Sequence, residues 1–108
     1  MGKLSGTVAS LGSGKGKALV LSENNISKSL SFEKPYVLIA KLTTPDITPL
    51  LIKAEAIVTD IGGLSSHAAN IARELGIPCI VDTKHASTTI NQGDYVEVNA
   101  DKNIVSWI

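Results

Sequence analysis

The sequence predicts a single α/β domain, spanning residues 1–108, with alternating strands and helices at its centre and further strands on either side. Continuous apolar runs at 36–40, 56–59 and 77–81 are typical of strands that are buried on both faces. An amphipathic segment at 66–75 lies between the second and third runs. A chain of 108 residues is long enough for one compact domain with a modest core.

The segment 66–75 is the clearest predicted helix. Gly76 is suited to its C-terminal position, and Pro78 prevents its continuation. A second helix is expected from about Thr44–Asp46 to Lys53, with Pro45 in its first turn, and a helical turn is expected at 86–90. The apolar face of the 66–75 helix is formed by four residues at positions i, i+3, i+4 and i+7: Ala68, Ile71, Ala72 and Leu75.

Shorter strands are expected towards both ends of the chain. Residues 11–14 are expected to form a loop, and the polar stretch 22–34 is expected to be a surface connection. The expected outer strands lie at 4–8, 16–21, 95–98 and 104–107.

Composition and charge exclude several classes of protein. Hydrophobic residues make up 44% and charged residues 19%, a globular balance. Ten basic and ten acidic residues cancel, so the chain lacks the basic surface expected for binding nucleic acid. No segment resembles a membrane span or a signal peptide, so a cytoplasmic location and no membrane partner are expected. Cys79 is the only cysteine and is expected to be a buried, inert thiol.

The segment 59–69 contains the candidate functional residues. Gly62 and Gly63 end an apolar run and allow close approach of the backbone to a ligand. Ser65 or Ser66 can cap the following helix, and the other hydroxyl can reach a phosphate oxygen. Free N–H groups at a helix N-terminus bind anions. His67 in the first helical turn is therefore a candidate acceptor of a phosphoryl group, since the neutral imidazole is the nucleophile.

Other interpretations of these residues are less specific. A single histidine in the first turn of a helix is usually a polar surface residue. His67 and His85 are the only imidazoles and do not lie in a cluster with metal-ligand spacing, so no metal site is expected. The segment 12–17 is superficially similar to a nucleotide-binding P-loop, but it lacks the glycine spacing and the following Ser or Thr, and it is interpreted as a hairpin.

The segment Gly62–Pro78, GGLSSHAANIARELGIP, strongly resembles the phosphohistidine signature of phosphoenolpyruvate-utilising enzymes. This family includes phosphoenolpyruvate synthase, pyruvate phosphate dikinase and enzyme I of the sugar phosphotransferase system. The resemblance continues through 37–40, 44–46, 56–59 and 93–98, and so covers nearly the whole chain.

The resemblance implies a swivelling β/β/α three-layer domain in which Nε2 of His67 carries the phosphoryl group. Gly62, Gly63, Ser65 and Ser66 match the positions that surround the phosphate. Arg73 also matches a motif position, where it contacts the phosphate or forms a structural salt bridge. The chain departs from the usual family pattern at four positions. Ser65 stands where threonine is common and keeps the hydroxyl. The other three lie away from the imidazole: Asp82, Asn99 and Asn103.

The resemblance implies a phosphocarrier, a phosphotransferase component that needs partner domains or subunits for a full reaction. An ATP-binding partner would phosphorylate His67, and a phosphoenolpyruvate- or pyruvate-type site would exchange the group with a small molecule. No cofactor is expected on this domain, and Mg²⁺ and ATP are implied on the partner. Two alternatives remain open: a non-catalytic regulatory or interaction module that keeps the fold, and an excised domain of a larger phosphotransferase.

Overall fold

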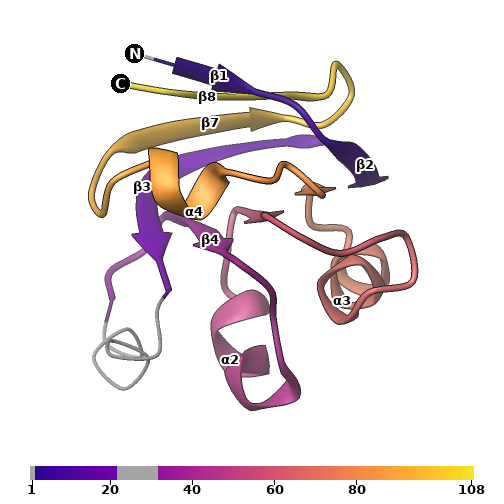
Figure 1. Ribbon diagram of the computed structural model, residues 1–108. Helices are drawn as coiled ribbons and strands as arrows, with labels where there is room; N and C mark the ends of the chain where they lie inside the picture. Colours follow the sequence, from indigo (N-terminus) through magenta and orange to yellow (C-terminus); the bar gives the residue numbers. More distant parts are fainter. Residues whose placement is uncertain (1, 22–31) are drawn as a thin grey trace.

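The computed structural model describes residues 2–21 and 32–108, so residues 22–31 of the expected surface connection lie outside the described part. Eight strands form one mixed sheet, in the order β1-β8-β7-β3-β4-β5-β6-β2 (Figure 1). The strands are β1 (Gly2–Leu4), β2 (Thr7–Ser10), β3 (Ser13–Val20), β4 (Tyr36–Ala40), β5 (Ala56–Thr59), β6 (Cys79–Val81), β7 (Tyr95–Asn99) and β8 (Ile104–Trp107).

Strands β3, β4, β5 and β6 are parallel to one another, and antiparallel strands extend the sheet on both sides. Strand β4 pairs with both β3 and β5, and Leu38 lies between Leu19 and Ile57 in register. All five residues of β4 are buried, which confirms the expectation for its continuous apolar run. The three expected central strands are therefore neighbours at the middle of the sheet.

The expectation of one strand at 4–8 is wrong. The chain forms β1 at one edge of the sheet and β2 at the other, and only residues 5–6 connect them. A Cβ on Gly6 would lie 2.2 Å from the carbonyl oxygen of Val81, so only glycine fits where the chain crosses. Because the two edges are joined by so short a link, the sheet must curl until they are close.

The glycine-rich segment 12–17 is not a hairpin but is mostly part of β3, which begins at Ser13. A Cβ on Gly14 would lie 2.2 Å from the carbonyl oxygen of Glu55, and one on Gly16 would lie 2.7 Å from that of Pro35. The backbone thus passes over two other segments at close range. Close packing therefore accounts for Gly14 and Gly16.

The core has two layers, as expected for a β/β/α domain. Alternate residues of β4 point to opposite faces of the sheet. Val37 and Ile39 pack in an inner cluster with residues of β7 and β8, such as Val98. Leu38 and its neighbours pack against the helices on the other face. Figure 1 shows β1, β8 and β7 above this central part of the sheet, and α2 and α3 below it.

Four short helical segments connect the strands: η1 (Pro45–Ile47), α2 (Thr48–Leu51), α3 (His67–Leu75) and α4 (Ala86–Thr89). The helix expected to reach Lys53 starts as a 3₁₀ turn and ends at Leu51. Ile52 is its C-cap, and the Ile52 N–H donates the last hydrogen bond of the helix to the Thr48 carbonyl. None of the helices within residues 2–21 and 32–108 is long and apolar enough to cross a membrane.

The predicted helix at 66–75 is α3, with the expected ends. Ser66 is its N-cap, and Gly76 ends it in the left-handed conformation at φ 70°. Ala68, Ala69 and Ala72 form its buried face, and these small side chains let the helix lie close to the sheet. The expected burial of Leu75 is wrong, since this residue of the last turn is 50% exposed.

Cys79 in β6 is fully buried, as expected. Burial raises the pKa of its thiol to about 12, against a smaller opposing effect of Arg73. We expect the folded chain to resist a thiol reagent at pH 8 and to react after unfolding in guanidinium. Above the ordinary thiol pKa the unfolded chain loses a proton that the folded chain keeps, so the free energy of unfolding falls as the pH rises. Rapid labelling of the folded chain would contradict this prediction.

Candidate functional site

Strand β5 and the loop that follows it bring the chain to His67. The Thr59 hydroxyl donates a hydrogen bond to the Ile61 carbonyl at 2.9 Å, so the chain turns directly after β5. Gly62 follows at φ 128°, where L side chains are strained, and a Cβ there would lie 3.3 Å from the Ser66 side chain. Gly62 is therefore needed to shape the loop.

The two serines have different positions, which the sequence leaves open. Ser66 is the cap: its Oγ accepts the N–H of Ala69 at 3.4 Å, and its own N–H donates to the Gly63 carbonyl at 3.1 Å. Ser65 is exposed, and within the described residues its carbonyl accepts a hydrogen bond while its hydroxyl makes none. The hydroxyl of Ser65 is thus available to a ligand.

His67 is the first residue of α3 and is partly exposed. The backbone N–H groups of His67 and Ala68 have no acceptor among residues 2–21 and 32–108, because they precede the first bond within the helix. With the helix dipole, they give this end of α3 a partial positive charge next to the imidazole.

Two threonines hold the imidazole. Nδ1 of His67 lies 2.8 Å from Oγ1 of Thr43, and Nε2 lies 3.4 Å from Oγ1 of Thr48. The Thr48 hydroxyl donates its proton to the Pro45 carbonyl at 2.8 Å, so it has no proton for Nε2. A neutral ring that donates from Nδ1 to Thr43 therefore keeps the lone pair of Nε2 free of a hydrogen bond.

Arg73 does not form a salt bridge within the described residues; its guanidinium donates to Oδ1 of Asn70 at 2.6 Å. Asn70 in turn donates to the Ser65 carbonyl at 3.3 Å. This chain of bonds ties the middle of α3 to the loop before it. Arg73 is exposed and directed towards that loop through Asn70, while its contact with a phosphate stays a prediction.

Asp60 anchors the start of the same loop. Its buried carboxylate accepts two hydrogen bonds from Ser87, one from the N–H at 2.7 Å and one from the hydroxyl at 2.5 Å. Its backbone N–H donates to the Ala40 carbonyl at 3.0 Å. The loop that carries the glycines is therefore fixed to α4 and to the end of β4.

Four residues of the site are not evident from the sequence: Thr43, Thr48, Asp60 and Asn70. Thr43 and Thr48 flank the short helical start at Pro45, but nothing in their spacing shows that this segment lies beside α3. Asp60 directly follows the apolar run of β5. A carboxylate at the end of a buried strand is the feature of the sequence that points to a structural role for Asp60.

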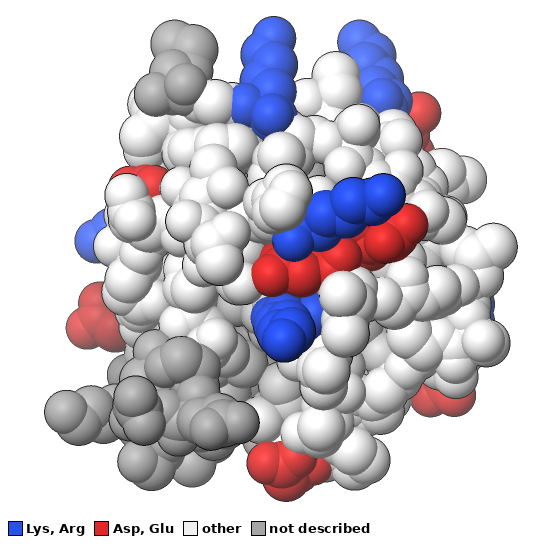
Figure 2. Space-filling model, viewed as in Figure 1, with Lys and Arg blue, Asp and Glu red and all other residues white. Residues whose placement is uncertain are grey.

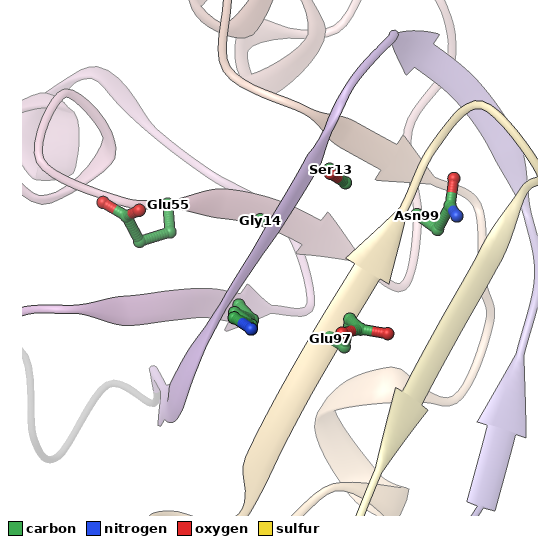
Figure 3. A pocket seen from close by; sticks show the side chains of 6 residues that line it. Ser13, Gly14, Glu55, Glu97 and Asn99 are labelled. Carbon is green, nitrogen blue, oxygen red and sulfur yellow. The ribbon is translucent and has the colours of Figure 1, made fainter.

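The structure also has hollows away from His67. One of about 410 Å³ is lined by residues of β3 and β7 and by Glu55 (Figure 3). In the view of Figure 2, acidic and basic side chains are interspersed and no broad surface of one sign appears. No group of three or more His, Cys, Asp or Glu side chains within residues 2–21 and 32–108 could hold a metal ion.

The mixed sheet, with α2 and α3 packed on one face, has the architecture of a swivelling β/β/α domain, and the match to known proteins is specific. Residues 32–103 match the family described as "PEP-utilising enzyme, mobile domain". The chain therefore belongs to the family of mobile domains of phosphoenolpyruvate-utilising enzymes.

The curated relatives are much longer proteins. The chain is 45% identical to a probable phosphoenolpyruvate synthase of Staphylothermus marinus over 100 residues, which is 93% of this chain and 12% of the relative. It is 41% identical to the phosphoenolpyruvate synthase of Pyrococcus furiosus over 102 residues, again 12% of that protein. The matching domain is therefore a small part of those enzymes.

Solved structures support the same fold. A solution structure of Enzyme I superposes with a TM-score of 0.63 at 33% identity, over 77% of this chain and 33% of that one. An aconitase X from Thermococcus kodakaraensis superposes over the whole chain with a TM-score of 0.71, but at 16% identity it shows only the shared fold.

Replacement of Gly63 separates structure from ligand binding at this site. A Cβ on Gly63 would meet no atom within 4 Å, so Gly63→Ala is expected to leave the thermal unfolding of the chain unchanged. If a phosphate needs the space beside this backbone, phosphorylation of His67 should fall about tenfold. Gly62→Ala is the comparison, because there the strained φ predicts a loss of stability as well. Full phosphorylation of Gly63→Ala would show that the space is not used.

Proposed function

We propose that the chain is a phosphocarrier that accepts a phosphoryl group on Nε2 of His67. The observation that carries the proposal is the arrangement of the ring: Nδ1 lies 2.8 Å from the Thr43 hydroxyl, and the Thr48 hydroxyl near Nε2 donates to the Pro45 carbonyl. In the tautomer with its proton on Nδ1, the lone pair of Nε2 therefore has no hydrogen-bond donor. The free N–H groups of His67 and Ala68 lie in the first turn of α3, as the imidazole does, and would stabilise the negative charge of the transferred group.

The transfer is a displacement at phosphorus. The lone pair of Nε2 forms the N–P bond as the P–O bond of the donor breaks, and the departing oxygen keeps the electron pair. The positive charge that develops on the ring is relieved by its Nδ1–H bond to Thr43. Transfer to an acceptor reverses these steps, and the imidazole returns to its neutral form. Phosphoryl transfer depends mainly on positioning and charge stabilisation, which a single oriented imidazole meets on the carrier side.

The donor and the final acceptor belong to partner domains or subunits. An ATP-binding phosphotransferase with Mg²⁺ would supply the phosphoryl group, and a phosphoenolpyruvate- or pyruvate-type site would take it or return it. This is supported by the relatives named phosphoenolpyruvate synthase, in which the matching segment is 12% of the protein. In this proposal the Mg²⁺ is bound together with ATP on the partner.

The proposal is tested by chemical phosphorylation of the 108-residue chain, followed by mass spectrometry at neutral and acid pH. Phosphoramidate phosphorylates reactive imidazoles without a protein partner. We expect one acid-labile phosphoryl group, mapped to His67 and assigned to Nε2 by the ring resonances. Labelling at the exposed His85 to the same extent, or at Nδ1 of His67, would contradict the proposal.

A further inference from the structure

Thr48 places an oxygen atom beside the atom of His67 that would carry the phosphoryl group. Its Oγ1 lies 3.4 Å from Nε2 of the imidazole, in hydrogen-bond geometry. Thr48 is the first residue of α2 and lies outside the segment Gly62–Pro78 that precedes and forms α3. The oxygens of a phosphoryl group on Nε2 lie two bonds from that nitrogen, so they would contact Oγ1 of Thr48.

The backbone around Thr48 holds this oxygen in place. The N–H of Thr48 donates to the Pro45 carbonyl, and the carbonyl of Thr48 accepts the N–H of Ile52 at 3.1 Å. Two residues further along, the Leu50 carbonyl accepts the buried hydroxyl of Tyr36 at 2.6 Å. Because Tyr36 belongs to β4, this bond ties α2 to the centre of the sheet. The hydroxyl of Thr48 is therefore presented to His67 by a fixed element.

The Pro45 carbonyl accepts two hydrogen bonds from Thr48, one from the N–H and one from the hydroxyl at 2.8 Å. If the O–H bond rotated away, the N–H bond would still satisfy the carbonyl, so the rotation would cost only one neutral hydrogen bond. A phosphoryl oxygen would be the better acceptor, because hydrogen bonds to an ionised group are roughly twice as strong as neutral ones.

We infer that the Thr48 hydroxyl binds the phosphoryl group on Nε2 of His67 and changes its hydrogen-bond acceptor when that group arrives. The inference rests on the proposed function of His67. In the free chain the hydroxyl donates to the Pro45 carbonyl. In the phosphorylated chain it donates to a phosphoryl oxygen, and its proton stays on Oγ1 throughout. The hydrogen bonding at the start of α2 therefore depends on whether the chain carries a phosphoryl group.

The test uses the 108-residue chain, phosphorylated with phosphoramidate, and three variants. Thr48→Val keeps the shape of the side chain and removes the hydroxyl, whereas Thr48→Ser keeps the hydroxyl. Thr88→Val is the matched control, because the N–H and the hydroxyl of Thr88 donate to the His85 carbonyl at 3.2 and 3.1 Å, as those of Thr48 do to Pro45. Thr88 lies in α4, which packs in the inner cluster on the other face of the sheet from α3.

The first measurement is a ³¹P NMR titration of the phosphorylated chain. A hydrogen-bond donor favours the doubly charged form of the phosphoryl group and so lowers its pKa. We expect Thr48→Val to raise the phosphoryl pKa by about 0.5, which is about threefold in the protonation constant. Thr48→Ser and Thr88→Val should match the wild type. A phosphoryl pKa that is the same in Thr48→Val as in the wild type would overturn the inference.

The second measurement uses the wild-type chain and does not depend on the folding of a variant. Phosphorylation should move the carbonyl ¹³C resonance of Pro45, because the carbonyl loses the bond from the Thr48 hydroxyl. The resonance of the His85 carbonyl should not move, since the Thr88 hydroxyl keeps its acceptor. A Pro45 resonance that stays in place would contradict the change of acceptor.

The two proposals fail in different ways. A chain that is phosphorylated on Nε2 of His67, with no effect of Thr48→Val on the phosphoryl pKa, would refute the role of Thr48 and leave the phosphocarrier intact. A chain that phosphoramidate does not label at His67 would refute the phosphocarrier and the role of Thr48 together.

Discussion

Replacement of His67 by alanine is expected to abolish acid-labile phosphorylation of the chain. The rate of labelling, by phosphoramidate or by a phosphotransferase with ATP, should fall about 100-fold or more. The imidazole supplies the nitrogen lone pair that forms the N–P bond, and its removal leaves the neighbouring threonine hydroxyls without this base beside them. The serine Oγ atoms lie within the same loop, so residual acid-stable labelling would show that a serine had become the acceptor. The measurement is mass spectrometry of the intact protein before and after acid treatment.

The matched control is His85→Ala. His85 is exposed and precedes α4, where its carbonyl accepts the N–H groups of Thr88 and Thr89. Alanine keeps that carbonyl, so the fold and the labelling of His67 should both be preserved. The His67 variant should also keep the unfolding temperature to within a few degrees, since its ring is held by two threonines at the surface. Labelling that persists in His67→Ala would refute the carrier role directly.

Replacement of Asp60 by alanine is expected to lower the free energy of unfolding by about 3 kcal/mol. The carboxylate is buried and accepts both the N–H and the hydroxyl of Ser87, and bonds to a charged group are the stronger ones. Its removal leaves the partly buried N–H of Ser87 without this acceptor. Denaturant unfolding followed by circular dichroism gives the change.

Asp60→Asn provides the graded comparison. The amide keeps one acceptor for Ser87, so we expect roughly half of the loss caused by alanine. Glu74→Ala is the neutral control, because Glu74 is exposed on α3 and alanine is a good helix former; its effect should stay within about 0.5 kcal/mol. If Asp60→Ala were as stable as the wild type, the bonds to Ser87 would contribute nothing and the loop would need another anchor.

The sequence predicted those elements whose own residues determine them. The run at 36–40 is apolar throughout and forms the buried strand β4, and the segment 66–75 carries its own cap and terminator and forms α3. The placement of His67 in the first helical turn followed from the same local pattern. The distinction between Ser65 and Ser66 did not, because either spacing permits a cap.

The remaining features depend on contacts between distant residues. The segment 4–8 divides into two strands because one half pairs with β8 and the other with β6. Thr43 and Thr48 reach the imidazole from 24 and 19 residues away. Nothing in the local sequence around Gly14 of β3 shows that a Cβ at this position would lie 2.2 Å from the backbone of another segment.

Strands β1 and β8 pair so that Gly2 lies opposite Trp107, and the two ends of the described chain emerge side by side. Figure 1 places α3 on the other side of the molecule from both ends. The rest of any longer polypeptide would join the domain at this one edge, which would serve as a common pivot with α3 far from it. Rotation about the pivot would carry the imidazole over distances comparable with the 32 Å length of the domain. Two separated active sites could then share one tethered reagent, at a local concentration set by the length of the tethers and independent of the amount of protein.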